Sequence, residues 1–322
     1  MPSAVASIAD QLFADGASHG SSLALVVQHR GEVVFEQYGH QPDTLFSPGG
    51  PVTADSTLIS WSMAKSLTQA AVGIAVGDGL LRIDAPAPIP AWRGTEKEAI
   101  TLLDLLEMRS GLEFVEDYVD DSVSHCLEML YGVGKDDMAA YAAGLPLVHS
   151  PGTVWNYSSG TTNIVSRILG DAVGGTQEAM SAFLRDRLFH PVGMSSAIVK
   201  FDTRGTFVGS SYVYATARDF ARFGQLYLDD GMVGDERILP EGWRDLARTQ
   251  IAYDRDEDLG YGRQWWLWPE FPGSLACHGY EGQRILVVPD RDLVVVHLGK
   301  VPADTRSIVR ESLRSLVMAF DT

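Results

Sequence analysis

Residues 61–66 read Trp61-Ser62-Met63-Ala64-Lys65-Ser66 and open an apolar, alanine-rich segment with helical character. Positions three residues apart lie on one face of a helix, so the Ser62 hydroxyl and the Lys65 amine can meet there. A serine hydroxyl is a poor nucleophile until a neighbouring base takes its proton, and a neutral lysine can be that base. The stretch therefore predicts a serine nucleophile activated by lysine, which is the chemistry of acyl transfer.

A Ser-x-x-Lys spacing arises by chance roughly once in 300 residues at ordinary composition, so the surrounding sequence determines whether it indicates a catalytic pair. The chain holds five lysines, and Lys65 alone follows a serine at this spacing. Ser60 or Ser62 can cap the helix, whose first N–H groups would stabilise an oxyanion. The alternative is a polar first turn from which Lys65 reaches solvent. Residues small enough for a tightly enclosed central helix are Ala64, Ala70, Ala71, Gly73 and Ala75.

Composition and charge bound the class of protein. The 322 residues are 45% hydrophobic and 21% charged, which is ordinary for a globular protein of one large or two medium domains. Net charge is −17, from 42 acidic against 25 basic residues. A nucleic-acid binder needs a basic face to neutralise phosphates, so this charge argues against nucleic acid as a partner.

Metal, disulfide and histidine-based chemistry find little support in the sequence. Cys126 and Cys277 are far apart, which argues against a disulfide framework or a zinc cage. The eight histidines show no His-Glu-x-x-His motif, so we expect neither a metal nor a cofactor. A Ser-His-Asp triad with His278 is conceivable, but no Gly-x-Ser-x-Gly elbow surrounds any serine.

The N-terminus lacks the marks of a targeting segment. Residues 1–16 have neither a basic n-region nor a continuous apolar core, so we expect no secretory signal. One face of a short amphipathic helix is instead formed by Ala4, Ile8, Leu12 and Phe13. No run of 18 or more apolar residues occurs, so we expect no contact with a membrane and a cytoplasmic protein.

Both ends of the chain contain strand patterns. Residues 22–38 are typical of a hairpin with its turn at Arg30-Gly31. Near the C-terminus the apolar runs 284–288 and 293–296 flank a polar turn and form a second hairpin. Apolar residues then recur at helical spacing over residues 305–320. These patterns predict one antiparallel sheet built from both ends of the chain.

The middle of the chain is helical in pattern, with Gly/Pro loops between the helices. The helix-like segments are residues 100–108, 163–173, 178–189 and 217–228. The natural assembly is an α+β fold, an antiparallel sheet flanked by helices plus an inserted helical domain, with the active site between them. We expect residues 1–82 and 250–322 to form the sheet domain together, and residues 83–249 to form the mostly helical domain.

Two further segments contain residues that could take part in catalysis or substrate binding. In Tyr157-Ser158-Ser159 a tyrosine close to a small hydroxyl can pass protons between nucleophile and leaving group, although the segment also fits an ordinary loop tyrosine. His278-Gly279-Tyr280 precedes the strand that begins at Arg284, and a glycine beside an edge strand permits close approach of a ligand. Taken alone, that segment also fits a glycine-rich hairpin turn.

These segments, in this order and with these flanks, resemble the penicillin-recognising serine hydrolases, specifically their class C β-lactamase-like group. That group includes carboxylesterases, D-amino-acid peptidases, acyltransferases and 6-aminohexanoate-oligomer hydrolases. The resemblance covers nearly the whole chain and implies a β-lactamase/transpeptidase-like fold. Its further blocks are the hairpin at Leu23, Leu102-Leu103-Asp104-Leu105-Leu106, Ser110-Gly111-Leu112, Pro151-Gly152, residues 217–224 and Gly282-Gln283.

The resemblance implies a role for each motif residue. Ser62 would form the acyl-enzyme, and Lys65 would be its base with a pKa well below the usual value of about 10.4. Tyr157 would carry a proton to the leaving group and help to activate water, so the principal base is either Lys65 or Tyr157. The oxyanion hole would combine the Ser62 N–H with an N–H at Tyr280 or Glu281.

Departures from the family pattern bear on the substrate. Tyr157-Ser158-Ser159 stands where β-lactamases and penicillin-binding proteins usually have Tyr-x-Asn. His278-Gly279-Tyr280 stands where they usually have Lys-Thr-Gly, whose lysine helps to bind the β-lactam carboxylate, with the alignment open by a residue or two. The resemblance therefore favours small esters or linear amides as substrates. A β-lactamase, a D-amino-acid peptidase, an acyltransferase and a non-turnover acyl-binding sensor are the alternatives.

The loop at residues 112–118 resembles the nylon-oligomer branch, where a tyrosine touches the substrate amide. Tyr118 is therefore either a binding residue or an ordinary loop tyrosine. The acidic cluster of this loop suits a cationic substrate end or simply a solvated loop, and consists of Glu113, Glu116, Asp117, Asp120 and Asp121. We expect a small-molecule substrate and a monomer or homodimer. The substrate-binding and oxyanion candidates are then Tyr118, Ser159, His278, Gly279 and Tyr280.

Overall fold

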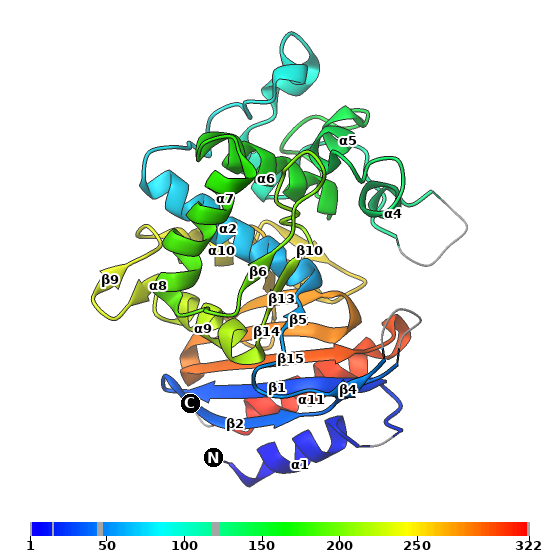
Figure 1. Cartoon of the computed structure of the whole chain (residues 1–322), viewed down its shortest axis with the longest axis vertical. Coiled ribbons are helices and arrows are strands. Elements are labelled where there is room, and N and C mark those ends of the chain that lie inside the picture. Colours follow the sequence, from blue (N-terminus) through cyan, green and yellow to red (C-terminus); the bar gives the residue numbers. More distant parts are fainter. Residues whose placement is uncertain (1, 15, 44–47, 118–122, 321–322) are drawn as a thin grey trace.

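The computed structural model describes residues 2–14, 16–43, 48–117 and 123–320, and an eight-stranded antiparallel sheet lies at its base (Figure 1). The strands follow the order β10-β11-β12-β13-β14-β15-β1-β2 across the sheet. Strands from the two ends of the chain pair directly, β1 with β15, which confirms that prediction. The strands are β1 Ser21–His29, β2 Glu32–Tyr38, β10 Ala252–Asp254, β11 Leu259–Tyr261, β12 Trp266–Leu267, β13 Leu275–Gly279, β14 Gln283–Val288 and β15 Leu293–Lys300.

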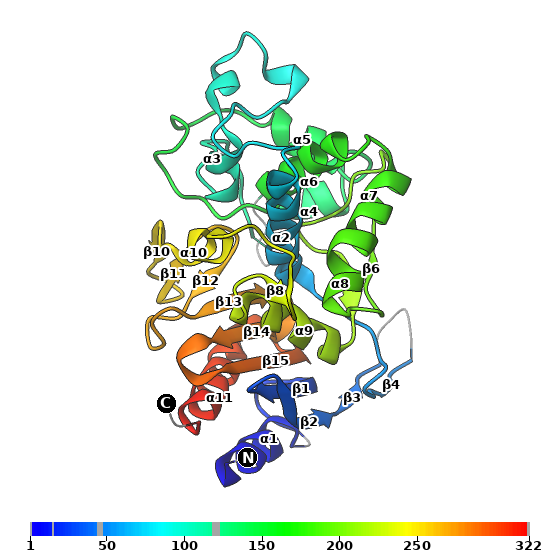
Figure 2. The ribbon, with the colours of Figure 1, turned by 90° about the vertical axis from the view of Figure 1, so that its left-hand side faces the viewer.

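Helices cover both faces of this sheet (Figures 1 and 2). α1 and α11 pack on one face, while α2 and α9 lie toward the other, together with the inserted helical region. The helices are α1 Ser3–Leu12, α2 Ala64–Gly77, α3 Leu102–Leu106, α4 His125–Leu130, α5 Met138–Gly144, α6 Ser159–Ala172, α7 Gln177–Phe183, α8 His190–Val192, α9 Ala217–Leu228, α10 Trp243–Arg248 and α11 Arg306–Met318. This is the predicted α+β architecture.

Short strands pair outside the main sheet. They are β3 His40–Gln41 with β4 Gly50–Pro51, β8 Met232–Val233 with β9 Glu236–Arg237, and the three strands β5 Leu58–Ile59, β6 Ile198–Val199 and β7 Val213–Ala215. The β5–β7 pair matters for the site, because β5 leads directly into the segment that carries Ser62.

Alternating side chains of the central strands supply two separate cores. Leu286 and Val295 join the core under α1 and α11, whereas Ile285 and Val294 join the core under α2 and α9. Successive residues of a strand point to opposite faces, so a continuous run of valine and leucine suits a sheet that is covered on both sides. Both predicted hairpins, β1–β2 and β14–β15, are present.

The predicted helices are present with changed ends. α9 has the predicted bounds, whereas α3 is shorter than residues 100–108, because Thr101 caps its start and Met108 has a φ of 57°. α6 begins before residue 163, because the Ser158 side chain accepts a backbone hydrogen bond and caps it. In both cases a capping hydroxyl sets the start of the helix.

The buried face of α1 overlaps the predicted one but is centred one residue further along. Val5, Ala9 and Leu12 are buried against the sheet and α11, whereas Ala4 is exposed. Leu12 belongs to both stripes, but the rest of the buried stripe is displaced by one residue, or about 100° around the helix axis. Ile8 and Phe13 of the predicted face are nevertheless partly buried against the same core, so the apolar pattern located the helix and erred only in the centre of its buried face.

α2 runs through the centre of the molecule. All residues from Ala64 to Ala75 are buried, as the small side chains predicted. Gly73 packs directly on Trp243, since an added Cβ would lie 2.4 Å from the indole Nε1. Only small side chains allow a helix to be enclosed so closely. α2 thereby holds Lys65 at the boundary between the sheet and the helical region.

The division into a sheet domain of residues 1–82 and 250–322 and a helical domain of residues 83–249 stays a prediction. α9 belongs to the helical part by sequence, yet it packs on the sheet. Gly224 lies so close to Val294 of β15 that an added Cβ would be 2.5 Å from Cγ1. The two predicted parts therefore share the core that lies between the sheet and α2 and α9.

Candidate active site

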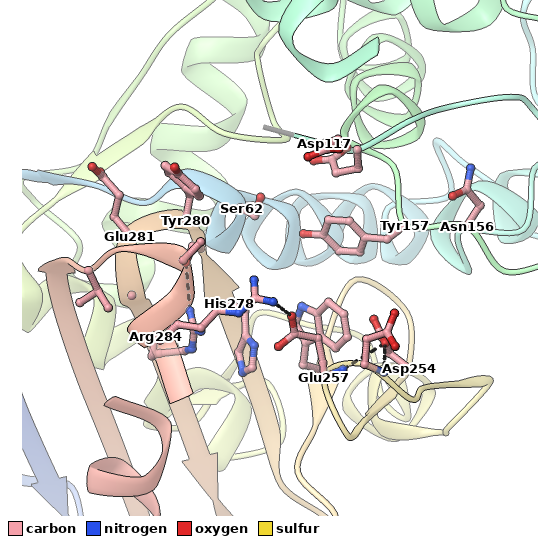
Figure 3. Close-up of a pocket in the computed structure, with 18 of the residues that line it drawn as sticks. Ser62, Asp117, Asn156, Tyr157, Asp254, Glu257, His278, Tyr280, Glu281 and Arg284 are labelled. Atoms are coloured by element: carbon pink, nitrogen blue, oxygen red, sulfur yellow. Dashed lines mark hydrogen bonds and ion pairs between the residues drawn. The ribbon is translucent and has the colours of Figure 1, made fainter. Parts of the chain in front are cut away.

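A cavity of about 760 Å³ lies where the end of β13 meets the segment before α2 (Figure 3). Ser62 and Tyr157 line it on the helical side, and the turn after β13 and the start of α11 line it on the sheet side. The predicted residues in its lining are Ser62, Tyr157, His278, Gly279 and Tyr280. Residues from distant parts of the sequence therefore line one cavity, with Lys65 and Ser159 directly behind Ser62.

Ser62 is presented by one turn of 3-10 helix, Trp61–Met63, which leads into α2. Trp61 has a φ of 44°, a conformation that costs free energy in a non-glycine residue, and its indole donates to the Glu281 carboxylate at 3.0 Å. The predicted serine cap of α2 is wrong, because the helix begins only at Ala64. The Ser60 hydroxyl instead lies 2.9 Å from the Trp61 carbonyl oxygen and 3.2 Å from that of Ser211.

Lys65 lies behind Ser62 and is only 1% exposed. Its ammonium donates to Ser62 Oγ at 3.0 Å, to Ser159 Oγ at 2.9 Å and to the Ser210 carbonyl oxygen at 3.2 Å. An ammonium group has three N–H donors, so each finds an acceptor inside the protein. The alternative in which Lys65 reaches solvent is therefore wrong.

Tyr157 points its hydroxyl toward Ser62 (Figure 3). The ring lies 4.8 Å from Lys65 Nζ and packs on Tyr261 and Trp266, with ring centroids 5.9 and 5.5 Å apart. Burial raises the pKa of Tyr157 above its usual value, and the positive charge of Lys65 opposes part of that rise. The phenol therefore keeps its proton at neutral pH, where it is a hydrogen-bond donor.

Ser159, at the start of α6, connects Lys65 to a carboxylate. Its Oγ accepts from Lys65 and donates to Glu116 Oε1 at 2.5 Å, while its backbone N–H donates to Glu116 Oε2 at 2.7 Å. Hydrogen bonds to a charged acceptor at a helix N-terminus are among the stronger ones in proteins. One chain of hydrogen bonds therefore runs from Ser62 through Lys65 and Ser159 to Glu116.

Glu116 is the functional candidate that the sequence did not single out. In the sequence it is one acidic residue of a loop, and its place beside Ser159 depends on a contact between segments 43 residues apart. One signal was available: Ser159 stands where the family usually has asparagine. A hydroxyl can accept from lysine and donate to a carboxylate through the same oxygen, which an amide cannot do.

His278 and Gly279 end β13, which is an interior strand and not the predicted edge strand. The error arises because β12 is only two residues long and pairs with β13 at Ala276 alone, so the last residues of β13 run beside the cavity. The predicted close approach of a ligand at the glycine stays a prediction, and what Gly279 meets in the structure is another backbone segment. An added Cβ on Gly279 would lie 2.3 Å from the Ser60 carbonyl oxygen.

His278 is a neutral side chain packed against two tryptophans. Its Nε2 accepts from Trp268 Nε1 at 2.9 Å, and its ring stacks on Trp266 with centroids 5.5 Å apart. Burial lowers the pKa of His278 well below its usual value. Among the described contacts it makes no hydrogen bond to Ser62, so the geometry gives the alternative Ser-His-Asp triad no support. Tyr280 is 41% exposed at the mouth of the cavity.

The remaining binding candidate, Tyr118, lies outside the described residues. Across the described ranges, no three His, Cys, Asp or Glu side chains gather where they could hold a metal ion. No helix in that part of the chain is long and apolar enough to cross a membrane.

An antiparallel sheet joined to a helical region, with a buried lysine behind a serine at their boundary, is the arrangement of the β-lactamase-fold serine hydrolases. The Beta-lactamase family model matches residues 8–309, and the chain belongs to that family. The 6-aminohexanoate-dimer hydrolase of Paenarthrobacter ureafaciens is 28% identical over 306 residues, which cover 88% of this chain and 74% of that protein.

Solved structures agree on the fold. A family VIII carboxylesterase superposes with a TM-score of 0.74 at 16% identity, covering 98% of this chain and 95% of that one. A class C β-lactamase from Rhodobacter sphaeroides superposes with a TM-score of 0.70 at 18% identity, covering 98% of this chain and 99% of that one. The predicted β-lactamase/transpeptidase-like fold is therefore confirmed.

Proposed function

We propose that this protein cleaves small esters or linear amides through an acyl-enzyme formed on Ser62. The observation that carries the proposal is the 3.0 Å contact between Ser62 Oγ and the Nζ of Lys65, a lysine that is 1% exposed. Ser62 lines a cavity large enough for a small substrate. Similarity to a 6-aminohexanoate-dimer hydrolase and to a carboxylesterase supports the choice of substrate class.

In the acylation half-reaction, Ser62 Oγ attacks the substrate carbonyl carbon while its proton passes to a neutral Lys65. The backbone N–H groups of Ser62 and Tyr280 stabilise the resulting oxyanion. The bond to the leaving group then breaks, the departing alcohol or amine takes a proton from Tyr157, and Lys65 returns its proton to Tyr157. The acyl group remains on Ser62 as an ester.

In deacylation, water attacks the ester carbon and gives its proton to Lys65, and the Ser62 oxygen leaves and recovers a proton from Lys65. The product is the free carboxylic acid, and the enzyme returns to its starting state. The raised pKa of Tyr157 supports a role as proton donor to the leaving group. We therefore propose Lys65 as the principal base.

The hydrogen-bonded chain from Lys65 to Glu116 supports a route by which this lysine becomes neutral. Lys65 has an acceptor for each proton of its ammonium form, yet a base must first give one proton up. Its proton moves to Ser159 Oγ as the Ser159 hydroxyl proton moves to Glu116. The result is a neutral amine and a protonated carboxyl group, so Glu116 is the proton acceptor and Ser159 the relay.

The test of the proposed function is Ser62→Ala, assayed for turnover of p-nitrophenyl butyrate and for labelling by a fluorophosphonate with intact-mass detection. Wild type should gain the mass of one label, and Ser62→Ala should gain none and lose at least ~10³-fold in kcat. Ser56→Ala, a serine outside the cavity lining, is the matched control and should label normally. Retained turnover in Ser62→Ala would overturn the proposal.

A second assay separates the ester and amide proposal from the β-lactamase alternative. Short p-nitrophenyl esters should be cleaved with a far higher kcat/KM than a cephalosporin, because Ser159 and His278-Gly279 replace motif residues that β-lactamases usually have. Comparable efficiency on the cephalosporin would place the protein with the β-lactamases instead. A single stoichiometric burst without turnover would favour an acyl-binding sensor.

A further inference from the structure

Arg284 is a buried cation in the wall of the cavity. It lies on β14 directly across from His278 of β13, lines the cavity and is 7% exposed. Its Nη1 donates to the carbonyl oxygens of Gly279 and Gln283 at 2.9 and 2.8 Å. Among the described residues, no Asp or Glu forms an ion pair with Arg284, and its buried Nε has no hydrogen-bond acceptor.

Other arginines in this region have a carboxylate partner. Arg306, which also lines the cavity, pairs with Glu257 at 2.5 Å, and the largely buried Arg263 pairs with Glu107 at 2.5 Å. Removing a charge from water is costly unless a counter-charge and hydrogen bonds replace the water. Burial lowers the pKa of Arg284 to about 10, so the group remains charged at neutral pH. The charge of Glu257 opposes part of this fall without forming an ion pair with Arg284, so a direct counter-charge is expected from the contents of the cavity.

The unused donors form one edge of the guanidinium group. Nη1 is held by two carbonyl oxygens, whereas neither Nε nor Nη2 donates to any described residue. The Nε–H and the adjacent N–H of Nη2 are parallel, and this edge matches the two oxygens of a carboxylate. We propose that Arg284 binds a carboxylate of the substrate, so that the preferred substrates are esters or linear amides with a free carboxylate. The proposal rests on the proposed function, because it concerns the substrate of the same cavity.

The rest of the cavity restricts where such a carboxylate can lie. Of the acidic side chains that line the cavity, Asp117 and Asp254 lie apart from Arg284, whereas Glu257 lies nearer to it on the sheet side (Figure 3). Like charges repel, so a carboxylate placed beside Asp117 or Asp254 would be disfavoured. The substrate is thereby oriented, with its carboxylate at Arg284 and its scissile carbonyl group at Ser62.

A purely structural role for Arg284 predicts a different outcome. Its hydrogen bonds to Gly279 and Gln283 also hold the turn that carries the proposed oxyanion donor at Tyr280. Loss of that support would slow every substrate by a similar factor. Loss of a carboxylate site would slow only the substrates that carry a carboxylate, so the ratio between two matched substrates separates the two roles.

Two matched pairs of esters provide this ratio. Mono-p-nitrophenyl glutarate and p-nitrophenyl valerate differ by a carboxylate in place of a methyl group on the acyl side. 3-Carboxyphenyl butyrate and phenyl butyrate differ by a carboxylate on the leaving-group side. In wild type, kcat/KM should favour the carboxylate member of one pair by about tenfold or more, as hydrogen bonds to a charged group imply.

Substitutions then assign the preference to a residue. Arg284→Gln should bring the kcat/KM ratio close to one, and Arg284→Lys should retain part of it, because an ammonium keeps the charge and loses the paired donors. Arg306→Gln is the matched control in the same cavity and should keep the wild-type ratio, since Glu257 already pairs with Arg306. A ratio near one in wild type for both pairs, or a wild-type ratio in Arg284→Gln, would overturn the inference.

A measurement on wild type alone covers the case in which Arg284→Gln does not fold. Hexanoate should inhibit p-nitrophenyl valerate hydrolysis with a Ki about tenfold below that of hexanamide, and equal Ki values would contradict a carboxylate site. Failure of the proposed function has a different signature. In that case wild type would hydrolyse neither member of a pair and Ser62 would take up no label, whereas equal hydrolysis of both members would leave the proposed function intact and remove the role of Arg284.

Discussion

Lys65 and Arg284 are two buried cations at one cavity, and their donors are used differently. Lys65 has three acceptors inside the protein: Ser62, Ser159 and Ser210. Arg284 has internal acceptors only for Nη1, and among the described residues its Nε has none. One cation is satisfied before any substrate arrives, and the other is not.

This difference separates the chemistry of the site from its choice of substrate. A base must be held in its working geometry in advance, and the three acceptors of Lys65 provide that. A buried donor without an acceptor costs free energy until a ligand supplies one. Changes beside Lys65 should therefore alter kcat for every substrate, whereas changes at Arg284 should alter the ratio between substrates.

The largest expected effect comes from Lys65→Met, which keeps the length of the side chain and removes the base. We expect kcat to fall by about 10³-fold for neutral and carboxylate-bearing esters alike. Steady-state kinetics on the matched ester pairs is the measurement. Lys97→Met is the control, because the Lys97 ammonium bonds to the carbonyl oxygens of Ala143 and Leu145 outside the cavity lining.

If kcat of Lys65→Met fell by less than tenfold, Lys65 would not be the base and its contrast with Arg284 would fail. That result would mean that Tyr157, the other candidate base, removes the proton from Ser62. A loss confined to the carboxylate-bearing esters would contradict the contrast differently, because Lys65 would then bind the substrate anion that we assign to Arg284.

The next effect concerns the proton relay. Ser159→Ala removes the hydroxyl that joins Lys65 to Glu116, and we expect kcat to fall by about 10²-fold. Ser159→Thr keeps the hydroxyl and should recover most of the activity, and Glu116→Gln should resemble Ser159→Ala. Glu113→Gln, an exposed residue of the same loop, is the control.

A relay also predicts a change in pH dependence. If Glu116 accepts the proton that leaves Lys65, then Glu116→Gln should move the kcat profile along the pH axis and also lower its maximum. An unchanged profile with a lower maximum would indicate that Glu116 only positions Ser159. Equal activity of Ser159→Ala and Ser159→Thr would likewise remove the hydroxyl from the mechanism.

Some of this site could be predicted from the sequence because its signals are local. Ser62 and Lys65 are three residues apart, and Tyr157 and His278-Gly279 follow in an order that the family also shows. The hairpins and α9 were predictable for the same reason, since alternation and helical spacing are read within one segment. The order of these family-like segments along the chain was sufficient to predict that the residues lie at one cavity.

The rest depends on contacts between distant segments. Glu116 meets Ser159 only after the loop packs on the start of α6, and Arg284 sits in an apolar strand pattern that gives no sign of a cavity. The order of strands is equally non-local, which is why β13 was wrongly placed at an edge. The centre of the buried face of α1 lies at Val5 and Ala9, because α11 and the sheet select it.

The smallest expected effect is acid destabilisation of the side of the molecule that holds Arg284. His297 of β15 is fully buried, with Nδ1 2.8 Å from the Gly282 carbonyl oxygen and Nε2 2.9 Å from Ser22 Oγ. Burial lowers the pKa of His297 from 6.5 to about 4. The histidine thus supports the turn just before Arg284, and it does so as a neutral group.

The sign of the pH effect follows from where the proton binds. Between pH 6.5 and about 4 the unfolded chain protonates His297 and the folded chain does not, so stability is fully present above pH 6.5 and falls as the pH falls. Between pH 7 and pH 5 the free energy of unfolding should drop by about 2 kcal/mol through this residue. Urea unfolding of wild type and His297→Gln at both pH values measures it, with the exposed His149→Gln as control.

The expected result is a smaller pH dependence in His297→Gln than in wild type or His149→Gln. Part of the dependence should remain, because burial also lowers the pKa of His278. If His297→Gln kept the full wild-type pH dependence, the acid response would have to arise elsewhere. The contrast between Lys65 and Arg284 would then be supported by kinetics alone. Stability measurements would give no evidence for it.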